Sequence, residues 1–238
     1  MKRGAPARPC GHVRNLGAGT LLCVSLALAG CAEGTETPDA QVAEVPDAGA
    51  TTAYTFRLDS ERSDPGAFRI SEESGGVRVR TGPAGIAWRE SDVTQSGPFA
   101  VRATFVQYEA PVGYREAYGV FVGGRDLQGA DVEYTYLLVR PTGDFLVKRR
   151  RGDTTETLVD WTAHEAVERV VEQGDEPRNT LAVEVGDGDT RFLVNGTEVH
   201  SMPTPEARPH GIVGIRANHR LDILLSDWAL ERRAGGAS

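Results

Sequence analysis

Residues 181–200 read LAVEVGDGDTRFLVNGTEVH, and their pattern indicates the fold class. Asn195-Gly196 is a strong signal for a two-residue hairpin turn, and residues 186–189 form a second turn upstream. The two turns agree on one register, which pairs Phe192 with both Val183 and Val199. One face then carries the apolar side chains Leu181, Val183, Val185, Phe192, Val194 and Val199. Glu184, Arg191, Glu198 and His200 fall on the other face, so the stretch predicts an antiparallel meander with one solvated side.

The same pattern extends in both directions from this meander. Short runs rich in β-formers, separated by Gly, Pro, Asp and Asn, predict strands. These runs are 54–58, 67–70, 76–81, 86–89, 99–108, 117–122, 132–140, 145–151, 155–161, 181–185, 190–194, 198–201, 212–217 and 221–230. One short helical candidate covers 164–171. Regularly spaced strands without long helical windows indicate an all-β sandwich or barrel.

A second predicted hairpin joins strands 132–140 and 145–151 through the turn residues 141–144, PTGD. A two- or four-residue loop pairs Arg140 with Phe145. One face then carries two tyrosines and two arginines: Tyr134, Tyr136, Arg149 and Arg151. Aromatic and guanidinium groups side by side can hold a sugar ring or an anion. The alternative interpretation is that the tyrosines are core residues and the arginines shield the rim, because both faces are partly apolar.

The N-terminus has the pattern of a secretory signal. Residues 1–30 combine a basic start with the apolar run TLLCVSLALAG, which is too short to span a bilayer. The four residues LAGC at 28–31 resemble the lipobox of bacterial lipoproteins. That resemblance implies cleavage before Cys31 and its modification with acyl chains such as palmitate. Ala32 follows, and the absence of Asp there implies the outer membrane or the cell surface over the inner membrane.

The distribution of aromatic residues predicts where the folded domain begins. Residues 31–53 contain no aromatic residue and predict a flexible tether, whereas all 16 aromatic residues lie at or beyond Tyr54. We therefore expect one domain over 54–232 and a tail over 233–238.

Residues 1–30 hold four basic residues and no acidic ones, so the net charge of −8 becomes −12 for the rest. Such an acidic balance argues against a nucleic-acid partner and against electrostatic docking on anionic lipid. Cys31 is the one cysteine left after cleavage, which leaves no structural disulfide.

Six motifs together resemble a concanavalin A-like (LamG-like) jelly roll. They are YGVFVGG (118–124), YTYLLVR (134–140), FLVKR (145–149), NTLAV (179–183), FLVNG (192–196) and GIVGIR (211–216). The resemblance implies an all-β fold of two antiparallel sheets, one of them curved, with ligands often held on the concave side. It also extends to relatives described as 3-keto-disaccharide hydrolases and laminarinase-type glucanases.

Catalytic patterns are weak in this sequence. Glycoside hydrolysis needs two carboxyl groups that flank the bond. Laminarinase-like members carry a Glu-x-Asp-x-Glu array on one strand, whereas the strand carboxylates here are isolated: Glu109, Glu133, Glu184 and Glu198. His164-Glu165 lacks the second histidine of a zinc helix. Residues 186–189 have carboxylates that suit calcium, but a turn explains them better.

These patterns predict a lipid-anchored extracytoplasmic lipoprotein whose jelly-roll domain binds carbohydrate without hydrolysing it. The predicted ligand-binding residues are Tyr134, Tyr136, Arg149 and Arg151, with Trp161 and His164 at the rim. One alternative is a glycoside hydrolase or lyase with His164 or His219 as the base. Another is a structural envelope protein that binds a protein partner. No cofactor is expected, with calcium left open.

Overall fold

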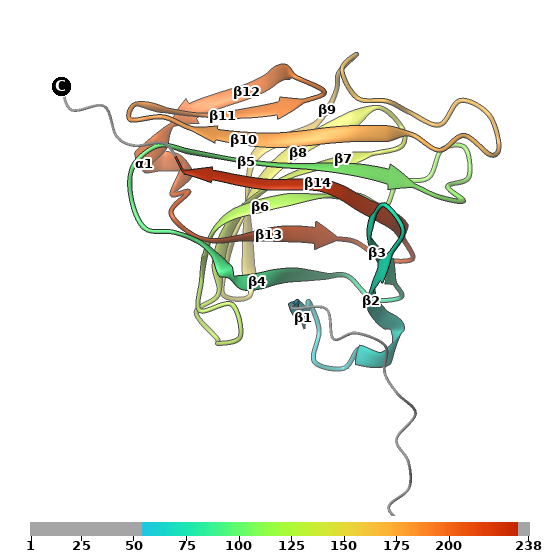
Figure 1. Ribbon diagram of the computed structural model, residues 1–238, viewed down its shortest axis with the longest axis horizontal. Coiled ribbons are helices and arrows are strands. Elements are labelled where there is room, and N and C mark those ends of the chain that lie inside the picture. The colour runs from blue at the N-terminus through green and yellow to red at the C-terminus, as the bar shows by residue number, and fades with distance from the viewer. Residues whose placement is uncertain (1–53, 233–238) are drawn as a thin grey trace, which may run out of the picture. The chain divides into compact units, whose positions relative to one another are not determined.

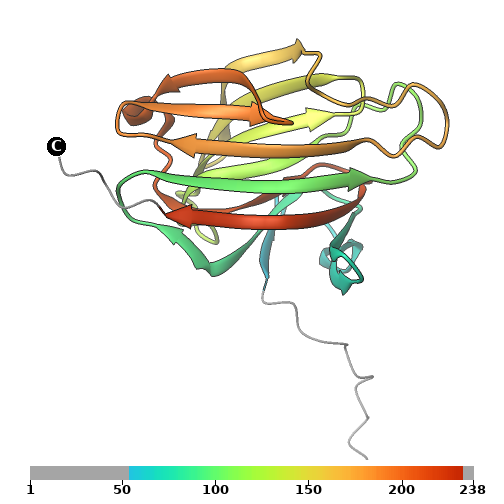
Figure 2. The same ribbon diagram turned by 45° about the horizontal axis from the view of Figure 1, so that its top comes forward.

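The computed structural model describes residues 54–232. The predicted signal peptide (1–30), the predicted lipidation site Cys31, the predicted tether and the predicted tail (233–238) lie outside the described residues. The described chain forms two antiparallel seven-stranded sheets packed face to face, so the all-β jelly-roll sandwich is confirmed (Figures 1 and 2). Among residues 54–232, no helix is long and apolar enough to cross a membrane.

Sheet A has the strand order β1-β4-β13-β6-β7-β8-β9, and sheet B has the order β12-β11-β10-β5-β14-β3-β2. The strands of sheet A are β1 (Thr55–Leu58), β4 (Gly85–Thr94), β6 (Tyr118–Arg125), β7 (Glu133–Arg140), β8 (Asp144–Arg151), β9 (Thr154–Ala163) and β13 (Gly211–Ala217). Those of sheet B are β2 (Phe68–Glu73), β3 (Gly76–Thr81), β5 (Phe99–Gln107), β10 (Arg178–Val185), β11 (Asp189–Val194), β12 (Thr197–Pro203) and β14 (Asp222–Arg232). Each predicted strand overlaps one of these elements.

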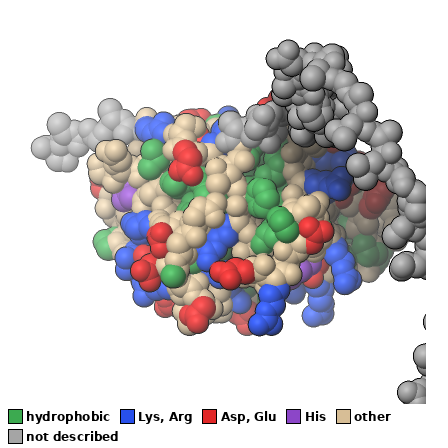
Figure 3. Space-filling view, turned by 90° about the horizontal axis from the view of Figure 1, so that it is seen from below, with side chains coloured by type: hydrophobic (Ala, Val, Ile, Leu, Met, Phe, Trp, Pro, Cys, Tyr) green, Lys and Arg blue, Asp and Glu red, His purple; other side chains and the backbone are tan. Residues whose placement is uncertain are grey.

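The main core lies between the two sheets. Because side chains alternate along a strand, one set from each sheet points inward. Sheet B contributes Phe105, Leu181, Val183 and Phe192, and sheet A contributes Tyr118, Val120, Leu137 and Ile215, all fully or almost fully buried. On the face turned to the viewer in Figure 3, acidic and basic side chains are interspersed around a few hydrophobic ones.

The observed strand pairing in the meander at 181–200 confirms most of the predicted register. Val183 pairs with Phe192, Val194 pairs with Thr197, and Glu184 accepts a hydrogen bond from Arg191 at 2.9 Å. The pairing of Phe192 with Val199 was wrong, because a register shift between Phe192 and Leu193 brings Phe192 opposite His200. His200 is therefore half-buried and stacks on the Phe192 ring at 5.9 Å, and it is not the solvated residue expected.

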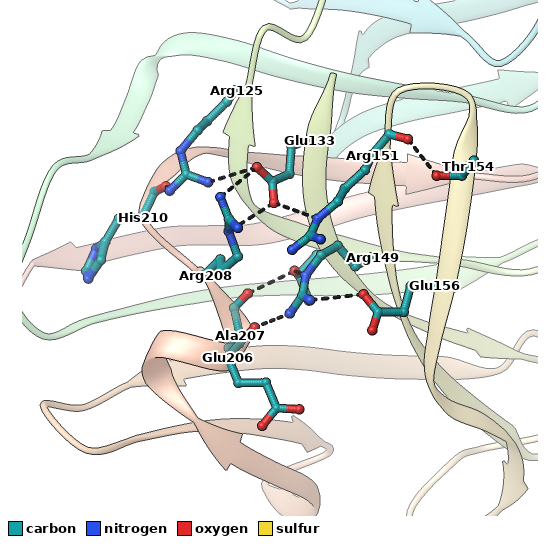
Figure 4. Close-up of polar contacts among 11 residues, drawn as sticks. Arg125, Glu133, Arg149, Arg151, Thr154, Glu156, Glu206, Ala207, Arg208 and His210 are labelled. Carbon is teal, nitrogen blue, oxygen red and sulfur yellow. Dashed lines mark hydrogen bonds and ion pairs between the residues drawn. The ribbon is translucent and has the colours of Figure 1, made fainter. Parts of the chain in front are cut away.

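The helical candidate at 164–171 was also wrong, because these residues form an irregular connection between β9 and β10. Two short helices occur within residues 54–232 instead. They are a 3-10 helix at Pro65–Ala67 and α1 at Thr204–Ala207. The segment after α1 leads directly into β13 and lies close to the ends of β7 and β8 (Figure 4).

Candidate functional site

The β7–β8 hairpin fixes which side chains share a face. Arg140 pairs with Asp144 across a three-residue loop in which Gly143 has a φ of +91°. The predicted pairing of Arg140 with Phe145 was therefore wrong by one residue. Because side chains alternate, Tyr134 and Tyr136 share a face with Lys148 and Arg150, to which they are paired. Arg149 and Arg151, which were predicted beside the tyrosines, have the opposite strand parity.

A second hydrophobic cluster covers the outer face of sheet A, away from the main core. Its aromatic members include Trp88, Phe121, Tyr134 and Tyr136, and the Tyr134 ring lies 5.2 Å from Phe121 and 5.5 Å from Tyr136. Tyr134 and Tyr136 are only 2% and 4% exposed. Gly214 makes room for this packing, since a Cβ there would lie 2.6 Å from the Phe121 ring. The tyrosines thus form the floor of the face and offer little open ring surface.

An ion pair between a nearly buried arginine and a partly exposed carboxylate lies on this floor. The Arg216 guanidinium from β13 donates to both carboxylate oxygens of Asp59, at 2.9 and 2.6 Å, and to the Tyr134 hydroxyl at 3.1 Å. It also lies 5.1 Å from the centre of the Tyr136 ring. Arg150 donates to the same Asp59 carboxylate at 3.1 Å. Two arginines therefore hold one carboxylate against the aromatic floor.

The charges of this ion pair keep both partners ionised. Burial alone would raise the pKa of Asp59, but the hydrogen bonds and charge of Arg216, with the charge of Arg150, lower that pKa overall. Burial acts to lower the pKa of Arg216, but Tyr134 and Asp59 raise it above its ordinary value. The network is therefore a fixed pair of charges rather than a proton donor. Sequence analysis missed both residues, since Asp59 and Arg216 are 157 positions apart and follow no local pattern.

The more open part of the outer face lies toward β8 and β9. The Arg140 guanidinium lies 4.2 Å from the centre of the Trp161 ring and donates to Asp144 at 3.0 Å. Trp161 and Lys148 are half-buried, and Lys148 is the one lysine of residues 54–232. Lys148 pairs with Tyr136 on one side and Thr157 on the other. Trp161 is thus the predicted site residue that presents an aromatic ring at the edge of this face.

Arg149 and Arg151 belong to a different group of contacts (Figure 4). Arg149 is 5% exposed and donates to the carbonyl of Glu206, to Glu156 at 3.1 Å and to Thr135 Oγ1 at 3.4 Å. Arg151 donates to Glu133 at 3.3 Å. The structure therefore separates these two arginines from the tyrosines with which they were predicted to act.

The two histidines considered as bases occupy separate places. His164 lines a cavity of about 430 Å³ with residues of the β7–β8 turn and with Arg169, and its Nδ1 accepts from the Ala166 amide at 3.1 Å. His219 is exposed, with its Nδ1 at 3.7 Å from a Glu116 oxygen. His164 lies beside the Trp161 end of sheet A, since its amide donates to the Gly143 carbonyl at 3.0 Å.

Three carboxylates of the outer face, Asp59, Glu90 and Asp144, accept hydrogen bonds. Glu90 accepts from the Trp88 indole at 2.6 Å, and Asp59 is held by two arginines. Burial would raise the pKa of Asp144, but hydrogen bonds from Arg140 and Thr142 lower it overall. Within residues 54–232, no group of three or more His, Cys, Asp or Glu side chains is arranged to hold a metal ion. Residues 186–189 form a turn in which the Gly186 amide donates to the Asp189 carbonyl at 2.8 Å.

Comparisons with known proteins show the fold. No protein-family description and no curated protein matches this chain. Among solved structures, the chain is similar to a protein of unknown function with a galectin-like fold from Bacillus subtilis, with a TM-score of 0.51 and 12% identity over 76% of this chain and 90% of that one. It is also similar to a variant of alginate lyase A1-II′, with a TM-score of 0.50 and 11% identity over 76% and 94%. A carbohydrate-binding module from Bacillus subtilis has a TM-score of 0.49 and 6% identity over 74% and 94%.

Proposed function

We propose that the outer face of sheet A binds carbohydrate. The observation that carries this proposal is the Trp161 ring, half-buried at the sheet edge beside Arg140, with Lys148 on the same face of the sheet, paired with Tyr136. A sugar offers an apolar C–H surface to an aromatic ring and hydroxyl groups to charged donors. The similarity to an alginate lyase, whose name denotes a saccharide substrate, adds support.

The part of this face around Tyr134, toward the other end of β7, is fixed before any ligand arrives. Asp59, Arg216 and Tyr134 satisfy one another, and the Tyr136 ring packs against the guanidinium. A pre-organised surface binds with a smaller loss of side-chain entropy than a mobile one. Lys148 supplies up to three N–H donors. Trp161 is half-buried, and the part of its ring that Arg140 leaves uncovered supplies the apolar contact surface.

The carboxylates of this face favour binding over hydrolysis. A glycosidase needs one carboxylic acid with a raised pKa that donates a proton to the leaving group. Asp59 and Asp144 have lowered pKa values, because arginines hold their charged forms. Neither is suited to that role at neutral pH. The proposed activity is therefore recognition of a saccharide without cleavage.

We also propose that the chain is a lipoprotein anchored through Cys31. The support is the basic start, the short apolar run and the LAGC sequence at 28–31. Mass spectrometry of the membrane-extracted protein tests this proposal. A mature chain that begins at Cys31 with acyl chains attached is the expected result, and an unmodified N-terminus at another residue contradicts it.

Affinity electrophoresis tests the binding function. We expect the purified protein to be retarded in gels that contain one of a panel of polysaccharides, with the polymer unshortened afterwards. Trp161→Ala should weaken that binding at least about tenfold, equivalent to about 1.4 kcal/mol. Trp228→Ala is the matched control, since Trp228 is also half-buried but belongs to β14 of sheet B.

The outcomes separate the alternatives. Equal retardation of the two tryptophan variants contradicts the site. Shortened polymer favours a lyase or hydrolase, and His164→Ala then tests the base in the cavity beside the β7–β8 turn. If EDTA in the gel abolishes the retardation, saccharide binding requires a divalent cation such as calcium. No retardation with any polymer, combined with capture of an envelope protein, favours the protein-binding alternative.

A further inference from the structure

Glu133 lies at the centre of three guanidinium groups, which we call the arginine cluster: Arg125, Arg151 and Arg208 (Figure 4). Glu133 begins β7 and is paired across the sheet with Arg125 on β6 and Arg151 on β8. Arg208 approaches from the segment after α1. The distances to the Glu133 oxygens are 3.6 Å from Arg125, 3.3 Å from Arg151 and 3.0 Å from Arg208.

The cluster satisfies its carboxylate and keeps a surplus of donors. The Glu133 side chain is 15% exposed, whereas the three arginine side chains are 44–51% exposed. Each guanidinium has five N–H donors. Arg208 uses two groups on Glu133, Arg151 uses one, and Arg125 also donates to the His210 carbonyl at 2.8 Å. Three positive charges against one negative charge leave a net charge of +2, with most N–H groups still available.

The position of Arg208 is held from both sides. Buried Arg149 donates to the Glu206 carbonyl, and Thr135 Oγ1 donates to the Ala207 carbonyl at 2.9 Å. Arg125 fixes the far side of the segment through the His210 carbonyl. Residues 206–210 are therefore fastened to sheet A immediately before and after Arg208, so that its guanidinium is placed before any ligand binds.

The backbone at Arg208 adds to this observation. Arg208 follows α1 with a φ of +51°, in the left-handed region where helix ends favour glycine. An arginine in this conformation carries a cost that a glycine avoids. The residue whose backbone is left-handed here is also the one whose side chain reaches Glu133. This coincidence favours a role for the guanidinium beyond closing the helix.

Another arginine and glutamate group in the protein has the opposite balance. On the exposed face of sheet B, Arg191 lies between Glu184 and Glu198, at 2.9 and 2.6 Å, which gives a net charge of −1. The whole chain has a net charge of −8. The cationic surplus around Glu133 therefore runs against the composition of the molecule, and ordinary surface pairing does not account for it.

We propose that the arginine cluster binds the oxyanion groups of an acidic polysaccharide. Planar guanidinium forks match carboxylate and sulfate groups in a way that a lysine does not. The overall acidic charge disfavours nucleic acid and anionic membrane, whose charge is denser. The choice of a saccharide as the carrier of the anion rests on the proposed function. The oxyanion site itself is distinct from the outer face of sheet A, because Glu133 and Arg151 have the opposite strand parity from Tyr134.

The test compares three polymers by affinity electrophoresis with the full chain. Polygalacturonate carries carboxylates, dextran sulfate carries sulfates, and dextran is neutral. We expect an acidic polymer to bind, with affinity that falls as salt rises because the contacts are ionic. The double variant R125Q/R151Q should bind that polymer at least tenfold more weakly, while Arg208 still satisfies Glu133. Arg191→Gln is the matched control, with a side chain 47% exposed, and should change the affinity by less than twofold.

Further variants separate this proposal from the sheet-face function. Loss of acidic-polymer binding in R125Q/R151Q with binding retained in Trp161→Ala supports the cluster and overturns the sheet-face site for that ligand. Unchanged affinity in the double variant, with an unchanged melting temperature, overturns the cluster whatever Trp161→Ala does. Because an acyl anchor binds any vesicle, phosphatidylcholine vesicles serve as the reference. Stronger binding to phosphatidylglycerol vesicles than to that reference and to either acidic polymer shows that the anion is a lipid headgroup and contradicts the choice of a saccharide. Arg151→Lys, which keeps the charge without the fork, should give an intermediate loss, and full retention there contradicts fork recognition.

Discussion

The negative charge of Asp59 balances two arginines, Arg150 and Arg216, on the outer face of sheet A. The Asp59 carboxylate accepts hydrogen bonds from Arg216 and Arg150. Without Asp59 these two positive charges would repel each other beside the Tyr134 and Tyr136 rings. We expect Asp59→Asn to lower the free energy of unfolding at pH 7 by about 1–3 kcal/mol, because it leaves the Arg216 guanidinium without its counter-ion. This range lies below that of fully buried pairs, since the Asp59 side chain is 31% exposed. Urea unfolding followed by circular dichroism measures the change.

The pH dependence of this difference has a defined sign. The pKa of Asp59 is lowered in the folded protein, so its charge stabilises the fold above the unfolded pKa. That contribution is lost as the pH falls through the lowered folded pKa. The stability gap between wild type and Asp59→Asn should therefore be constant from about pH 7 to 5 and shrink below about pH 4. Asp187→Asn, in an exposed turn, serves as the control, and a gap that grows on acidification contradicts the assignment.

Single residues also show how far sequence reasoning reaches. The period of two placed Tyr134 and Tyr136 on one face, and the structure agrees. Whether that face was core or open surface depended on the side chains packed around it, such as Trp88 and Phe121 from other strands, which alternation within one hairpin does not identify. Asp59 and Arg216 are in contact although they are 157 positions apart, so no local spacing in the sequence predicts their hydrogen bond. Side-chain identity predicted the chemistry available, and the fold decided which groups meet.

At the scale of elements, the β7–β8 turn decides which cations join the tyrosines. Gly143 has a φ of +91° in this three-residue loop, a conformation that costs other residues about 1–2 kcal/mol. We expect Gly143→Ala to reduce stability by about that amount, since the nearest atoms leave room for the added methyl group and only the backbone is strained. Gly188→Ala is the control, because the φ of Gly188 lies outside the left-handed region and no atom lies within 4 Å of the place that its methyl group would take. Equal stability of the two variants in urea would contradict the turn geometry.

The same turn explains why strands were easier to predict than their register. Composition and alternation located every strand, but a loop of three residues instead of two or four exchanges the two faces of β8. That exchange replaced Lys148 and Arg150 with Arg149 and Arg151 in the predicted site. The Asn195-Gly196 turn, whose residue types specify its length, gave the correct pairing of Val194 with Thr197. Further along the same hairpin, the register shift between Phe192 and Leu193 places His200 opposite Phe192. No residue type in the sequence predicts this bulge.

At the scale of the whole molecule, the sandwich is closed by its last strand. β14 lies between β5 and β3, so β2 and β3 join the rest of sheet B through it. Its Trp228 indole also donates to Asp92 of β4, at 3.0 Å, which links it to sheet A. The strands that pair with β14 come from much earlier in the chain, so the fold depends on contacts distant in sequence. We infer that residues 54–232 unfold as one cooperative unit.

Hydrogen exchange tests this cooperativity. Ile223 of β14 is fully buried in the main core, whereas Leu224 on the same strand is half-buried and points away from it. Ile223→Asn places an amide among apolar side chains and should cost about 3 kcal/mol or more, whereas Leu224→Asn should cost less than about 1 kcal/mol. If the sandwich is one unit, amides of β7 and β8 in sheet A should lose the same protection free energy as those of β5 and β10 in sheet B. Protection kept in sheet A while sheet B exchanges would show that the two sheets unfold separately, because the loss would then be confined to the strands that β14 joins.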